Sequence, residues 1–296
     1  MGYLYLVIAT LFGTTKGYCG KKVSGYVNET KDAILSNLIR MLLCCLVGVV
    51  LVVCSGGFAA FDIGFEGFLI SALSGVASAF FVVSWLFAVK QGAYMLVDVF
   101  LSVGLLVPIM LCAVLFNEKI EWNHCVGFLV LILSVALLSS YNNSIKEKLT
   151  PKATLLLILC SISSGCSSFT SKWFVRYSGG TLVSSFNLYT YLTASLVLFL
   201  CYMYFNNKQK EEKASFEIKP IFHLIVIMSV ALFLNSYFLT LSASLLPAAV
   251  LYPLNSGLSL ILSAAMSSII YKEKLTLKCI GGILLAFISL IIINVL

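Results

Sequence analysis

The sequence contains an internal repeat whose matching positions are separated by a constant 155 residues. Residues 92–138 align without a gap on residues 247–293. The matching positions are a Glu-Lys pair, a later glycine and a serine: Glu118 and Lys119 with Glu273 and Lys274, Gly127 with Gly282, and Ser134 with Ser289. This shared register predicts that one structural unit occurs twice in the fold.

Both copies of this unit are too apolar for a soluble protein. Hydrophobic residues make up 60% of the chain, charged residues make up 10%, and the mean hydropathy is +1.05. A soluble fold of this length would have nowhere to bury so much apolar surface. The apolar runs are long and do not alternate with polar residues, which predicts membrane-spanning helices and not barrel strands.

Charged residues, glycines and prolines divide the chain into about ten apolar spans. The predicted spans are 3–20, 34–54, 67–89, 93–116, 122–140, 153–171, 181–205, 221–243, 248–270 and 279–295. Residues 1–150 and 151–296 each hold five of them. A unit with an odd number of crossings returns the chain on the opposite face, so its second copy must be inverted. We therefore expect an all-α integral membrane protein with two inverted five-helix repeats.

Enzyme and nucleic-acid-binding classes are not supported by the sequence. The chain has no HExxH, nucleophile elbow, P-loop or CxxC pattern, so we expect no catalytic residues, no metal site and no cofactor. The formal net charge is +7, but the basic residues fall in the loops between spans. Anionic lipid headgroups are therefore the expected partner of these residues, and nucleic acid is not.

The last sixty residues resemble the closing four-helix unit of EamA-type transporters, which belong to the drug/metabolite transporter superfamily. The resemblance rests on a Pro-Ala turn, a proline within a span, a Glu-initiated turn and a glycine in the last helix: Pro247, Pro253, Glu273 and Gly282. Gly13, Arg40, Glu118 and Gly127 also fit in the first half. The resemblance implies ten helices around a central cavity, a small-molecule substrate, and both termini in the cytoplasm.

Two charged side chains lie deep within predicted spans, and a third lies nearer an edge. Lys16 and Asp98 are the deep ones, and Tyr94 shares a helix face with Asp98. An ionisable residue inside the membrane is a candidate for function, so we predict that Lys16, Tyr94 and Asp98 bind substrate. A buried Lys16–Asp98 ion pair without a ligand role is the alternative. Arg40 is expected to extend toward the headgroups.

Neutral polar groups complete the predicted site. Asn235 lies in the eighth span, and Tyr252 and Asn255 lie in the ninth. Pro253 removes a backbone donor, so the ninth span is expected to be kinked or unwound, either around substrate or for packing alone. Trp85 either lines the cavity or fills it. In contrast, Glu118 and Glu273 are expected to favour the N-terminal dipoles of the spans that follow them.

These features together predict a secondary transporter that moves a small polar metabolite across the plasma membrane by alternating access. A coupling proton or ion is a candidate second partner. The balance of Lys16 and Asp98 favours a zwitterion or a neutral polyol, such as an amino acid or a sugar. The alternative is a non-transporting membrane protein, a lipid-handling or assembly subunit that has kept the same fold.

Membrane orientation can be tested directly with a reporter at the C-terminus. Loops after odd-numbered spans hold fourteen lysines, whereas loops after even-numbered spans hold three basic residues. The positive-inside rule places the lysine-rich loops in the cytoplasm and both termini outside. A C-terminal phosphatase or fluorescent reporter should therefore report an outside terminus. A cytoplasmic signal from a folded fusion would instead support the orientation that the resemblance implies.

Overall fold

The computed structural model describes residues 1–24, 26–27, 30–90, 101, 104–139, 151–208, 218–270 and 277–295. Within these residues the fold consists of α-helices and two short 3-10 helices, η1 (Gly57–Phe61) and η2 (Lys219–Ile221), without any strand. In the first half the α-helices are α1 (Gly2–Ser24), α2 (Thr30–Gly56), α3 (Gly64–Lys90), α5 (Leu106–Phe116) and α6 (Trp122–Ser139). In the second half they are α7 (Pro151–Ser178), α8 (Val183–Lys208), α9 (Phe222–Ala243), α10 (Ala248–Ile270) and α11 (Leu277–Val295).

The described helices match the predicted spans in number and order. Most ends differ from the prediction by a few residues, because polar residues at a span's edge continue the helix beyond its apolar run. The fourth predicted span is an exception: only its later part, α5, forms a described helix, and residues 91–100 lie outside the described part of the chain.

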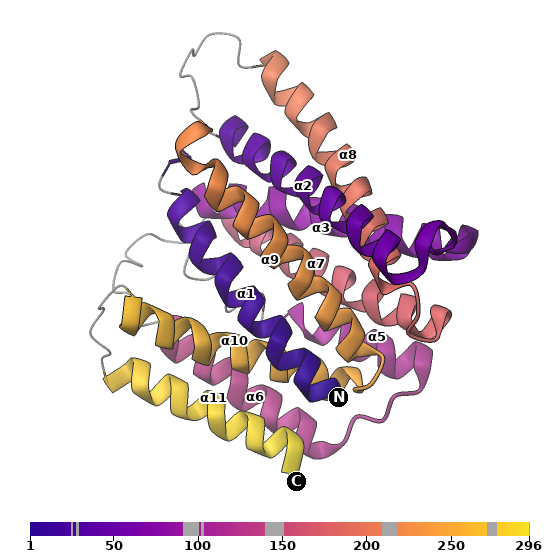
Figure 1. Ribbon diagram of the computed structural model, residues 1–296. Helices are drawn as coiled ribbons and strands as arrows, with labels where there is room; N and C mark the ends of the chain where they lie inside the picture. The colour runs from indigo at the N-terminus through magenta and orange to yellow at the C-terminus, as the bar shows by residue number, and fades with distance from the viewer. Residues whose placement is uncertain are drawn as a thin grey trace.

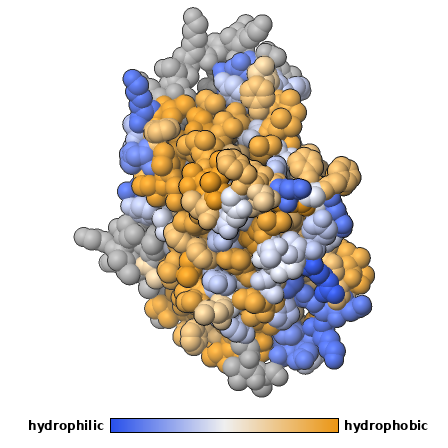
Figure 2. Space-filling model, turned by 45° about the vertical axis from the view of Figure 1, so that its right-hand side comes forward, coloured by the Kyte–Doolittle hydropathy of each residue, from blue (hydrophilic) through white to orange (hydrophobic). Residues whose placement is uncertain are grey.

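The surface of the bundle is that of an integral membrane protein. Five of the described helices are long and apolar enough to cross a membrane, judged by length and composition. Large hydrophobic side chains are exposed along many helices, including α2, α7 and α8. Figure 2 shows these apolar side chains across the middle of one face, with hydrophilic groups toward its edges. Such a surface suits contact with lipid.

Four helix pairs make the most extensive contacts in the bundle (Figure 1). They are α1 with α9, α3 with α7, α6 with α11, and α2 with α8. Each pair joins one helix of the first half to one of the second half. The two halves of the chain are therefore interleaved and do not form separate bodies.

The α6–α11 pair is joined by two reciprocal hydrogen bonds. Ser134 Oγ donates to the carbonyl of Gly282 at 2.6 Å, and Ser289 Oγ donates to the carbonyl of Gly127 at 2.7 Å. The two bonds join the four residues that the 155-residue repeat aligns, each serine to the glycine of the other copy. Because the earlier residue of α6 contacts the later residue of α11, the two helices run antiparallel.

Both termini and the turns that follow α2, α5, α7 and α9 lie at one end of the bundle, which we call the turn end. Ser242 Oγ at the end of α9 donates to the carbonyl of Gly2 at 2.9 Å. Ser55 and Ser184 join the end of α2 to the start of α8 at 3.0 Å. The turn end comprises residues 57–63, 117–121, 179–182 and 244–247. The other ends of these described helices therefore lie at the opposite end of the bundle.

Helices α3 and α8 approach each other closely at Gly75. A Cβ atom added there would lie 2.5 Å from the carbonyl oxygen of Thr190 and 2.7 Å from Thr193 Cβ. A backbone carbonyl cannot rotate away as a side chain can. Gly75 thus sets the distance between α3 and α8, in the way that small residues allow close helix packing in membranes.

Replacing Gly75 should destabilise the bundle. Gly75→Ala would force α3 away from α8 and is expected to cost about 1–3 kcal/mol, the range seen for overpacked sites. Gly281→Ala is the matched control, because a Cβ there meets nothing within 4 Å. Thermal unfolding of the purified protein in detergent should show a lower midpoint for Gly75→Ala and an unchanged or higher midpoint for Gly281→Ala. Equal midpoints would contradict this role of Gly75.

Candidate functional site

Two basic side chains, Lys16 of α1 and Arg40 of α2, are half-buried in the bundle. Arg40 Nη1 contacts the thioether sulfur of Met228 on α9 at 3.9 Å, and Arg40 Nε is shielded from solvent without a hydrogen-bond partner. Helices α1 and α2 both pack against α9. The Arg40 guanidinium lies against α9, and its expected extension toward the headgroups stays a prediction.

Asn235 of α9 faces α1 and joins the two helices. Its amide Nδ2 donates to the carbonyl of Ala9 at 2.6 Å. Gly13 leaves the space for this side chain, because a Cβ at Gly13 would lie 3.0 Å from Asn235 Nδ2. This contact uses one donor of the amide in packing α9 against α1. A substrate-binding role of Asn235 stays a prediction.

Helix α10 contributes Tyr252 and Asn255 one turn apart. Tyr252 is 2% exposed, and its hydroxyl donates to the carbonyl of Ser168 on α7 at 2.6 Å. Asn255 Oδ1 is shielded from solvent and has no hydrogen-bond partner. The helix runs continuously through Pro253, so the expected unwinding of the ninth span is not present. Of these two predicted residues, Asn255 keeps an unused acceptor inside the bundle.

The remaining predicted site residues cannot be placed in this way. The backbone of Trp85 belongs to α3, and its side chain is outside the described part. Tyr94 and Asp98 lie outside the described residues, as do Glu273 and Lys274. The predicted meeting of Lys16 and Asp98 therefore stays a prediction.

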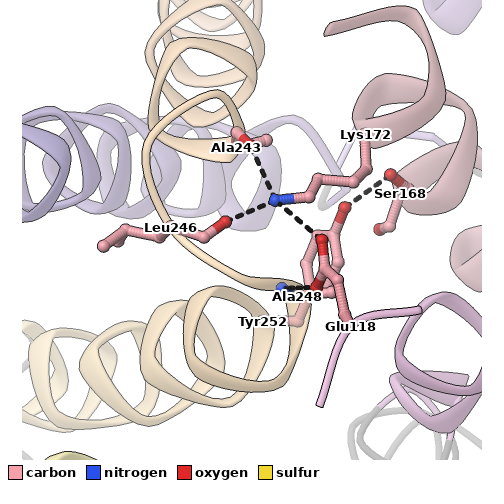
Figure 3. Close-up of polar contacts among 7 residues, drawn as sticks. All are labelled: Glu118, Ser168, Lys172, Ala243, Leu246, Ala248 and Tyr252. Carbon is pink, nitrogen blue, oxygen red and sulfur yellow. Dashed lines mark hydrogen bonds and ion pairs between the residues drawn. The ribbon is translucent and has the colours of Figure 1, made fainter. Parts of the chain in front are cut away.

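A second charged cluster at the turn end, which we call the corner, was not predicted (Figure 3). Lys172 Nζ of α7 lies 3.2 Å from Glu118 Oε1, and both side chains are largely buried, at 12% and 15% exposure. The same ammonium donates to the carbonyls of Ala243, at 2.8 Å, and Leu246. Glu118 Oε2 accepts a hydrogen bond from the backbone N–H of Ala248 at 2.6 Å.

The corner matches its two charges to the dipoles of two helices. Lys172 binds carbonyls at the end of α9, where a helix carries partial negative charge, and Glu118 binds the first N–H of α10, where a helix carries partial positive charge. The expectation that Glu118 favours the dipole of its own following span is wrong, because its carboxylate caps α10. The corner ties the end of α5 to α7, α9 and α10.

Other chemical sites find no support in the described residues. No group of three or more His, Cys, Asp or Glu side chains there is placed to hold a metal ion. The cysteines that can be described are free thiols, most of them within helices. A surface hollow beside the start of α6 and the end of α11 is lined by Glu121, Trp122, Asn123, Val126 and Ile292, and contains none of the predicted site residues.

Comparison with known proteins identifies the family through the second half of the chain. Residues 151–295 match the model of the EamA-like transporter family. The second half of the chain belongs to the EamA-like transporter family, which is part of the drug/metabolite transporter superfamily. The fold is therefore that of a membrane transporter family.

A solved structure titled only "Crystal structure of protein" shares the fold. Its TM-score is 0.78 at 14% sequence identity, and the match covers 99% of this chain and 96% of that one. The likeness therefore extends over both halves and not only over the half that the family model matches. A search of curated proteins finds no match.

The corner should contribute to the stability of this EamA-like protein. Lys172→Met leaves the carboxylate of Glu118 without its cation and two carbonyls without their donor, which should cost roughly 3 kcal/mol. The double variant Lys172→Met, Glu118→Gln removes both charges and should recover part of that loss. Thermal unfolding in detergent measures both effects.

The matched control for the corner is Lys119→Met, because Lys119 is the neighbouring lysine and is exposed. Its unfolding midpoint should stay within about 1 °C of the wild-type midpoint, as for most surface changes. If Lys119→Met and Lys172→Met had the same midpoint, Lys172 would have no role in holding α9 and α10.

Proposed function

We propose that this protein is a secondary carrier that moves a small polar metabolite across the plasma membrane by alternating access. Its two proposed inverted repeats are residues 1–150 and 151–296. A proton or ion is the candidate coupling partner. The observation that carries the proposal is the reciprocal bonding of Ser134 with Gly282 and of Ser289 with Gly127.

These reciprocal bonds support two inverted repeats for a geometric reason. When residue i of one unit contacts residue j of the other, and the equivalents of i and j make the same contact in reverse, the two units are related locally by a two-fold axis. An axis parallel to the helices would make α6 and α11 parallel. Since they are antiparallel, the axis lies across the helices, in the plane of the membrane. This is the arrangement of inverted-repeat carriers.

The helix pairing supports the same arrangement. If the helices of the first half correspond in order to those of the second, α1 corresponds to α7 and α3 to α9. Exchange of the halves then turns the pair α1–α9 into the pair α7–α3, and leaves α2–α8 and α6–α11 unchanged. All four major pairs are thus consistent with one exchange of the two repeats.

Unused polar groups inside the bundle support a solute-binding role. Asn255 Oδ1 and Arg40 Nε are shielded and lack partners, although buried polar groups are nearly always hydrogen-bonded in a folded protein. A solute that supplies the missing partners would account for both. We keep Lys16, Trp85, Tyr94, Asp98, Asn235, Tyr252 and Asn255 as the proposed substrate-binding residues.

Uptake into proteoliposomes across a panel of amino acids, sugars and organic acids tests the proposal. A carrier should give saturable uptake of at least one solute, and excess unlabelled solute should compete with it. Protein-free liposomes provide the background. Equal uptake with and without protein for every solute would favour the non-transporting alternative, a lipid-handling or assembly subunit.

Asn255→Leu separates solute binding from folding. The change removes a buried acceptor that has no partner, so thermal stability should be unchanged or higher. Transport should fall by about tenfold or more, since a buried hydrogen bond to the solute would be lost. Tyr252→Phe gives the comparison for stability: it removes the hydrogen bond to the Ser168 carbonyl and should lower stability by about 1 kcal/mol. Full transport by a stable Asn255→Leu variant would exclude a binding role for Asn255.

A further inference from the structure

Lys16 and Arg40 lie at similar distances from the turn that joins α1 and α2. Lys16 is in the last part of α1 and Arg40 in the first half of α2, on either side of the turn that joins the two helices. At about 1.5 Å per residue, both Cα atoms lie roughly 12–15 Å from that turn.

The Arg40 guanidinium and the face of α1 that carries Lys16 meet the same part of α9. Lys16 and Gly20 are one turn apart on α1, and a Cβ at Gly20 would lie 3.7 Å from Met228 Sδ. The same sulfur is the contact of Arg40 Nη1. Met228 thus stands between the face of α1 that carries Lys16 and the guanidinium of Arg40.

Neither cation has an oxygen partner in the part of the chain that can be described. A thioether sulfur is a weak acceptor, and it is the contact that Arg40 makes there. Arg40 Nε has no partner, and Lys16 takes part in no hydrogen bond or ion pair with a described residue. Two cations of like sign, held together inside a membrane, are costly unless a negative group compensates them. The corner shows the contrast, because its Lys172 is fully partnered.

We infer that Lys16 and Arg40 form an oxyanion subsite on the transport path, which takes the carboxylate or phosphate group of a small organic anion. The inference rests on the proposed transport function and names its substrate class. A planar guanidinium with free Nε and Nη donors suits two oxygens of one anionic group, and the ammonium of Lys16 adds a second charge. This differs from the zwitterion or polyol that the sequence favours, because Arg40 adds a second inward cation.

Ligand-induced thermal stabilisation in maltoside detergent, which carries no phosphate, tests the subsite without requiring transport. The probes are inorganic phosphate, succinate, glycerol 3-phosphate, alanine and glucose, each compared with sodium chloride at equal ionic strength. At least one of the three anions should raise the midpoint in a saturable way, as a ligand of the native state does. Stabilisation by alanine or glucose alone would overturn the inference, as would the absence of any stabilisation by the anions.

Variants of Lys16 and Arg40 test whether these two residues bind the stabilising anion. Arg40→Gln and Lys16→Gln should each weaken the apparent affinity for the anion by about tenfold or more, since each loses a charged hydrogen bond. Arg176→Gln and Lys119→Gln are matched controls at exposed positions and should bind like the wild type. Arg40→Lys keeps the charge but lacks the paired N–H donors of the planar guanidinium. It should bind the anion more weakly than the wild type and more tightly than Arg40→Gln.

Stability without ligand separates this inference from a purely structural role. Removing an uncompensated buried charge should leave the midpoint of Arg40→Gln equal to or above that of the wild type. A fall of the midpoint in Arg40→Gln, with anion affinity retained in Arg40→Lys and Lys16→Gln, would overturn the subsite. Anion stabilisation without uptake of any solute would instead contradict the proposed transport and leave the subsite standing. Uptake of alanine or glucose, with no stabilisation by the anions, would support the proposed transport and contradict the subsite.

Discussion

Helices in lipid gain little from burying apolar side chains against one another, because lipid tails are equally apolar. This bundle therefore depends on close backbone approach and on hydroxyl groups that bond to carbonyls of neighbouring helices. Gly75 allows α3 to approach the backbone of α8, and Ser134 and Ser289 join α6 to α11. Positions of this kind fix which helices pair, and the pairing places the polar groups of the interior.

The charged groups inside the protein follow two different arrangements. In the corner, Glu118 and Lys172 compensate each other and the ends of α9 and α10. Every charge there has a partner, as expected of a structural element. Lys16 and Arg40 are arranged in the opposite way, as two like charges on helices that pack against α9 near Met228. Among the described residues no carboxylate compensates them, and a ligand would supply the missing negative charge.

The sequence predicted the helical class and the order of helices well, because apolar runs of about twenty residues have few alternative structures in lipid. It predicted the start of α2 less well. The second span was predicted to begin at residue 34, whereas α2 begins at Thr30, so Arg40 lies a full turn farther from the helix start than expected. The polar residues before the apolar run continue the helix, and hydropathy alone does not reveal this. The capping of α10 by Glu118 was also missed, because that contact joins residues 130 positions apart.

Counterflow in proteoliposomes tests the central claim, that this EamA-like protein is a carrier with a solute site alternately open to each side. Vesicles are loaded with an unlabelled anion that stabilises the protein, and the same anion is added outside in labelled form at low concentration. A carrier should accumulate the label transiently above its outside concentration, because outward movement of unlabelled solute returns the empty site to the label. Simple equilibration of the label, or no entry at all, would contradict the account.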